Sequence, residues 1–161
     1  MKKNPPILII LVVSIIIIIG SFFIYEKYFK SDDMYISILE ENKMDFEYVA
    51  KEMEQWQSGW IGFESNNTYD NAIIINNHVF ASSQNIVDGV ANDDDFYASL
   101  MRIYELDAIS CVMIEGNEVI FYFSNPPAYY RGGFVYSEKI ETDSISKEID
   151  KHWMLRMIPN I

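Results

Sequence analysis

The chain has 161 residues, of which 24 are acidic and 12 are Lys or Arg, so its formal net charge is −12 at pH 7. This charge disfavours nucleic acid as a partner, because the phosphates would be repelled. Cys111 is the single cysteine, which excludes an internal disulfide. With 50% hydrophobic and 15% aromatic residues, the chain has enough apolar side chains for one domain with a large core.

The first element is an apolar run over residues 7–25, ILIILVVSIIIIIGSFFIY, which contains no charge. A helix rises about 1.5 Å per residue, so the run covers roughly 28 Å, close to the ~30 Å hydrocarbon core of a bilayer. We therefore predict a transmembrane helix here, with the lipid bilayer as its partner. A short cytoplasmic N-terminus at residues 1–6 precedes it, and a polar neck at residues 26–33 follows it.

A cleaved signal peptide is the alternative interpretation of the same run. Lys2 and Lys3 suit the charged start of such a peptide, but the run exceeds the usual 7–15 apolar residues and no small-x-small cleavage site follows it. The basic residues before the run favour an N-terminus inside the cell, and so a C-terminal domain outside the cell membrane. Beyond the run, 10 basic and 24 acidic residues leave a formal charge of −14.

Two stretches have helical periodicity. Residues 34–57 carry one apolar stripe, with a break expected at Asn42 and an end at Ser58-Gly59. Residues 94–106 form the second, and the aspartates at its start, Asp93, Asp94 and Asp95, suit the positive end of a helix. The apolar stripe of residues 34–57 consists of Phe46, Val49, Ala50, Met53 and Trp56.

The clearest strand signal is a hairpin of residues 108–115 and 118–124, joined by Gly116-Asn117. A two-residue connection that starts with glycine is typical of a type II′ turn. Pairing outward from this turn places two sets of side chains on opposite faces. The core face would hold Val112, Ile114, Val119, Phe121 and Phe123, and the other, also partly covered, would hold Cys111, Met113, Ile120 and Tyr122.

Shorter β-rich segments complete the prediction. Strands are expected near 133–137 and 153–158, and shorter ones at 60–63, 72–75 and 79–82, whereas 141–150 is polar with at most a helical turn. The order of elements predicts an α+β domain over residues 34–161, with an antiparallel sheet and helices on one face.

No pattern of residues predicts catalysis, a cofactor or a metal site. Asp93, Asp94 and Asp95 lack the alternating ligand spacing of a calcium loop, and capping explains them better. His78 and His152 have no neighbouring cysteine or second histidine with zinc-ligand spacing. Cys111 lies in an apolar strand, where its thiol is expected to be unreactive.

One loop suggests a binding role, the segment NPPAYYRGG at residues 125–133. Tyr129, Tyr130 and Arg131 are of the residue types enriched where proteins contact partners, so we predict them as partner-binding residues. The alternative is that the tyrosines cover the edge of the sheet and the glycines, Gly132 and Gly133, are turn residues.

A family resemblance is carried by the apolar run and by three segments beyond it. These segments are NKMDFEYVA (42–50), GGFVYSEK (132–139) and HWMLRM (152–157). This layout resembles small single-pass membrane-anchored proteins of unassigned function from low-GC Gram-positive bacteria. The resemblance implies an anchored extracytoplasmic domain of cell-envelope or immunity type.

The expected function is therefore a membrane-tethered interaction module rather than an enzyme, with an unknown envelope protein as partner. One alternative is an immunity or inhibitor protein against a cationic toxin. Another is a glycan hydrolase that uses carboxylates alone, which would need two acids about 5–10 Å apart in a cleft.

Overall fold

The structure is a computed structural model that describes residues 32–63, 72–124, 130–139 and 145–159. The predicted transmembrane run at residues 7–25 lies outside these ranges, as does most of the predicted neck, so both stay predictions. Within the described ranges, no helix is both long and apolar enough to cross a membrane.

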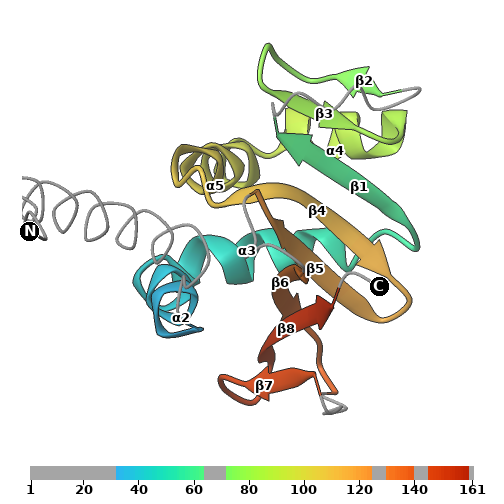
Figure 1. Cartoon of the computed structure of the whole chain (residues 1–161). Coiled ribbons are helices and arrows are strands. Elements are labelled where there is room, and N and C mark those ends of the chain that lie inside the picture. The colour runs from blue at the N-terminus through green and yellow to red at the C-terminus, as the bar shows by residue number, and fades with distance from the viewer. Residues whose placement is uncertain (1–31, 64–71, 125–129, 140–144, 160–161) are drawn as a thin grey trace, which may run out of the picture.

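The described residues form an α+β fold, as predicted, with four helices packed on a large antiparallel sheet (Figure 1). The eight strands have the order β2-β3-β1-β4-β5-β6-β8-β7. In chain order the elements are α2 (Asp32–Glu41), α3 (Lys43–Met53), β1 (Gly59–Phe63), β2 (Ile73–Ile74), β3 (Val79–Ala81), α4 (Gln84–Asn92), α5 (Asp94–Glu105), β4 (Ile109–Glu115), β5 (Glu118–Phe123), β6 (Tyr130–Tyr136), β7 (Ser146–Glu148) and β8 (Trp153–Pro159).

The predicted first helix is two helices, α2 and α3, and the expected break at Asn42 is confirmed. Four residues of the apolar stripe are fully buried in α3, because they face the sheet. The helix ends at Met53, four residues earlier than predicted. The N–H groups of Gln55 and Trp56 then donate to the carbonyls of Glu52 and Met53, at 3.3 and 3.1 Å. Hydrogen bonds between residues three apart form a tight turn between α3 and β1.

The central hairpin has the predicted register, with Glu115 opposite Glu118. Gly116 adopts a φ of +64°, whereas Asp107 is the single non-glycine residue with positive φ in the described chain. Asn117 therefore has negative φ, which agrees with the predicted type II′ turn. The predicted core face is confirmed, because Val112 and Phe121 are fully buried beneath the helices.

The opposite face of the sheet is partly covered, as predicted. Ile120, Val135 and Met154 form a small buried cluster there. Beside it, the Arg156 guanidinium donates from Nη1 and Nη2 to the two carboxylate oxygens of Glu118, at 2.7 and 2.8 Å. This two-point ion pair ties β8 to β5 across β6.

Two elements differ from the sequence prediction. Residues 146–148 form β7, an exposed edge strand paired with β8, so the expected helical turn is wrong there; residues 141–144 lie outside the described ranges. The second is α4, which was not predicted from the sequence. It has few buried apolar residues, Ile86 and Val90, and it contains Gly89 and two asparagines, which are weak helix formers.

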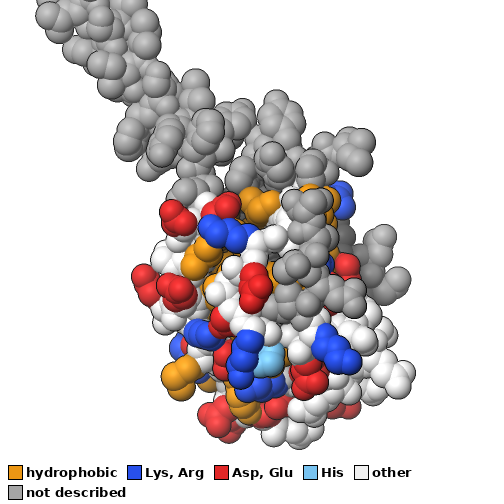
Figure 2. Space-filling view, turned by 90° about the horizontal axis from the view of Figure 1, so that it is seen from below, with side chains coloured by type: hydrophobic (Ala, Val, Ile, Leu, Met, Phe, Trp, Pro, Cys, Tyr) orange, Lys and Arg blue, Asp and Glu red, His pale blue; other side chains and the backbone are white. Residues whose placement is uncertain are grey.

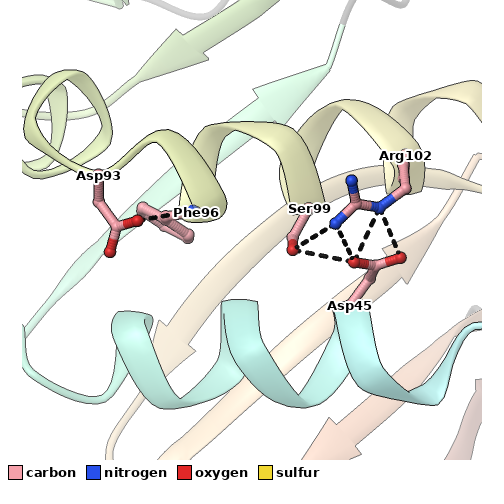
Figure 3. Close-up of polar contacts among 5 residues, drawn as sticks. All are labelled: Asp45, Asp93, Phe96, Ser99 and Arg102. Carbon is pink, nitrogen blue, oxygen red and sulfur yellow. Dashed lines mark hydrogen bonds and ion pairs between the residues drawn. The ribbon is translucent and has the colours of Figure 1, made fainter.

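The predicted capping role of the aspartate trio is confirmed at Asp93. This residue is the N-cap of α5, and its Oδ1 accepts a hydrogen bond from the Phe96 N–H at 2.9 Å (Figure 3). Its Oδ2 accepts a second bond from the Tyr48 hydroxyl of α3, at 2.9 Å. The Phe96 N–H and then the Tyr48 hydroxyl lower the pKa of Asp93.

Replacing Asp93 by alanine is expected to destabilise the fold by about 1–2 kcal/mol, because one orphan N–H of α5 loses its acceptor. The free energy of unfolding, measured by urea denaturation, checks this. Asp94→Ala is the matched control, because Asp94 is exposed in the same turn and adds only a dipole contribution of about 0.3–1 kcal/mol. Equal losses in the two variants would contradict the capping assignment.

A second polar contact also joins α3 to α5 (Figure 3). Arg102 donates from Nε to both oxygens of Asp45 at 2.9 Å and from Nη2 to Oδ1 at 2.6 Å. The buried Ser99 hydroxyl donates to Asp45 Oδ1, also at 2.9 Å. The guanidinium is the main reason that the pKa of Asp45 lies below its ordinary value. Asp45 therefore links the two helices.

Candidate functional site

A pocket of about 810 Å³ lies at the end of the sheet where β4 turns into β5. One wall consists of the residues that directly follow α3, the second is the tip of the hairpin, and the third is the segment after β6. Among its lining residues are Glu54, Trp56, Glu118, Glu138 and Lys139. Its volume falls within the roughly 300–1,000 Å³ of ordinary ligand sites.

Glu54 is the C-cap residue of α3, at the negative end of the helix dipole. Partial desolvation, and then the nearby carboxylate of Glu138, raise the pKa of Glu54 above its ordinary value. An acid at a helix C-terminus with a second acid nearby is electrostatically unfavourable. The fold therefore holds negative charge at this end of α3 without an evident gain in stability.

A tight turn after β6 positions Glu138. The hydroxyl of the buried Ser137 donates to the Lys139 carbonyl at 2.9 Å, and the Lys139 N–H donates back to that hydroxyl at 3.2 Å. The Ser137 N–H donates to the His152 carbonyl at 3.0 Å, which fixes the turn to the start of β8. The backbone that carries Glu138 is therefore ordered by three hydrogen bonds.

Trp56 is held between the pocket and α4. Its ring lies 5.8 Å from that of Phe96, between centroids. A Cβ added to Gly89 would lie 2.5 Å from Trp56 Cζ2, so only glycine leaves room for the indole at that position of α4. Trp56 packs against the core, is half-buried, and is one of the residues that line the pocket.

The three carboxylates of the pocket differ in their partners. Glu118 is neutralised by Arg156. Glu54 and Glu138 make no ion pair with any basic side chain of the described residues. His152 and Lys51 act on Glu54 through space and oppose the rise in its pKa, but neither forms an ion pair with it. The pocket therefore offers two carboxylates that no ion pair neutralises, next to an aromatic ring.

No family model, curated protein or solved structure matches this chain. The resemblance to single-pass membrane-anchored proteins stays a prediction, and function is inferred from the residues themselves.

The predicted partner-binding residues lie away from the pocket. Tyr129 is outside the described residues, Tyr130 opens β6 opposite Pro159, and Arg131 is exposed on β6 opposite Ile158. The pocket adjoins the other end of the same strand. Gly132 and Gly133, which the alternative interpretation placed in a turn, lie inside β6.

Cys111, His78 and His152 have local contacts that explain them without a catalytic or metal-binding role. Burial raises the pKa of the Cys111 thiol to about 11, which disfavours the reactive thiolate. His78 stacks on Tyr104, with 5.3 Å between the ring centroids, and the His152 N–H donates to Asp150 at 2.9 Å. In the described part of the chain, no group of three His, Cys, Asp or Glu residues is placed to hold a metal ion.

Proposed function

We propose that this protein is a membrane-tethered module that binds a cationic protein partner on the outer side of the cell membrane. The observation that supports it best is the pocket at the end of α3, where Glu54 and Glu138 form no ion pair with a basic side chain of the described residues. The formal charge of −14 beyond the apolar run also attracts a cationic partner from a distance.

The arrangement of the helices suits a tethered receptor. The proposed anchor precedes α2, and α2 joins the N-terminal end of α3 (Figure 1). The pocket lies at the C-terminal end of α3. The 11 residues of α3 span about 16 Å at 1.5 Å per residue. The pocket is therefore displaced along α3 from the end that leads to the membrane, where a partner in the envelope can reach it.

The segment Tyr129–Arg131 is proposed as a second contact with the same partner. Deleting residues 125–133 would not test this, because Tyr130 to Gly133 are part of β6. On the face that Figure 2 shows, hydrophobic side chains lie in small groups among acidic and basic ones. A polar surface of this kind fits a reversible interaction better than an obligate interface.

The test is a triple substitution, Tyr129→Ser, Tyr130→Ser and Arg131→Ser, in the full chain expressed in its host. Chemical cross-linking of intact cells, followed by purification of the tagged protein, should recover an envelope partner with the parent chain and lose it with the variant. Lys151→Ser, an exposed basic residue away from the segment, is the control. Unchanged recovery with the triple variant would contradict a role for this segment.

Two further functions remain as proposals. The same acidic pocket would suit an immunity protein that neutralises a cationic toxin, and protection of cells from such a toxin would distinguish this case. The neighbouring acids Glu54 and Glu138, with the raised pKa of Glu54, favour a carboxylate-dependent glycan hydrolase as the third candidate. Release of reducing sugar from cell-wall glycan, lost in Glu54→Gln, would support the hydrolase.

A further inference from the structure

We infer that the pocket at the end of α3 receives a single basic side chain, Arg or Lys, of the partner, held against Trp56 between Glu54 and Glu138. This inference rests on the proposed function, and it assigns the ligand class and the residues that bind it. Three independent features of the pocket favour an organic cation over other ligands.

The first feature is electrostatic. The C-terminal end of α3 carries partial negative charge from the helix dipole, and Glu54 is its capping residue. Glu138 adds a second carboxylate that acts on Glu54 through space. A positive charge placed between the two carboxylates would relieve their repulsion, so cation binding is favoured by the charge already present in the free protein.

The second feature is the aromatic wall. Trp56 is the preferred residue type for a cation–π contact, because the face of the indole is electron-rich. Gly89 and Phe96 fix this ring, so little side-chain entropy is lost when a ligand packs on it. An arginine side chain is well matched to the site, because its planar guanidinium can stack on the ring and hydrogen-bond to a carboxylate.

The third feature is the set of neighbours, which disfavours the other ligand classes. No third His, Cys, Asp or Glu of the described residues completes a metal-binding group here. An anion would meet two carboxylates that no ion pair of the described residues neutralises, and Lys139 is the single Lys or Arg among the lining residues. The neutral amides of Gln55, Gln57 and Asn117 also line the pocket and can accept hydrogen bonds from a guanidinium or ammonium group.

The experiment measures binding of a dye-labelled peptide, three arginines alternating with glycine, to the full chain in uncharged maltoside micelles by fluorescence anisotropy. The same peptide with citrulline, a neutral isostere of arginine, is the ligand control and should not bind. The variant Glu54→Gln with Glu138→Gln is expected to raise Kd about tenfold, because two partly exposed charge contacts are lost. Trp56→Leu, which keeps an apolar side chain against Phe96, should also weaken binding.

A matched pair of variants separates the pocket from general attraction to an acidic surface. Glu40→Gln with Glu105→Gln changes the net charge equally at exposed sites outside the pocket and should leave Kd unchanged. Lys139→Gln should lower Kd about threefold by removing a like charge from the pocket, whereas Lys151→Gln should not.

Each outcome decides the inference. Weakening confined to the pocket variants supports it. Equal weakening in the control pair would overturn it in favour of diffuse surface attraction, and absence of arginine-peptide binding would also overturn it. The proposed function is decided separately by recovery of the envelope partner, so the two can fail independently.

Discussion

Replacing Gly133 by alanine is expected to destabilise the domain by about 3 kcal/mol or more, as overpacking of a core without room to relax does. A Cβ at this position would lie 2.4 Å from the Phe121 carbonyl oxygen and 3.2 Å from the Tyr122 Cα. Both are backbone atoms of β5, so no side-chain rotation can relieve the contact. The two strands would have to separate where Gly133 pairs with Tyr122. Urea denaturation of the full chain measures the loss.

Gly132→Ala is the matched control for this prediction. The nearest atom to its added Cβ is the Met157 sulfur, at 2.3 Å, which is the movable end of a flexible side chain. We therefore expect a smaller loss at Gly132 than at Gly133, although the residues are adjacent. A Gly133→Ala protein as stable as the parent, or less affected than Gly132→Ala, would contradict the strand spacing described here.

The second large effect is expected at Phe46, the central contact between α3 and the sheet. Its ring is fully buried, with centroids 5.0 Å from Phe121, 5.5 Å from Phe134 and 6.2 Å from Trp153. Phe46→Ala should lower the free energy of unfolding by about 3–5 kcal/mol, because it leaves a cavity that these rings cannot fill.

Met44→Ala provides the control on the same helix. Met44 is 86% exposed, so its truncation should change the free energy of unfolding by less than about 0.5 kcal/mol. Similar losses for Phe46→Ala and Met44→Ala would show that α3 does not pack on the sheet with the face described.

The central hairpin could be predicted from sequence because all of its determinants are local. Gly116 sets the turn, and alternation of apolar residues then fixes which of Val112 and Cys111 faces the helices. The stripe of α3 was predictable for the same reason, since its spacing follows from one helix. Asp93 was recognised as a cap because capping depends on position within a few residues.

The pocket could not be predicted, because its parts are distant in the sequence. Glu54, Glu118 and Glu138 come from three segments, and each alone has the composition of an ordinary solvated surface. The position of the Trp56 ring depends on Gly89 in α4, and the composition of α4 does not predict a helix. The edge strand β7 was missed because Ser146, Lys147 and Glu148 show no apolar alternation, and pairing with β8 alone defines it.

We propose that residues 7–25 hold the chain in the membrane and that the described domain lies outside. A reporter enzyme that folds only outside the cell membrane, fused after Ile161 in the full chain, tests it most directly when cell fractions are analysed together with activity. We predict an active reporter that stays with the membrane fraction on an uncleaved chain. If only a reporter that requires the cytoplasm were active, the placement of the domain outside would be contradicted. If the mature chain were shortened near Ser21 and released from the membrane, the anchor would be contradicted.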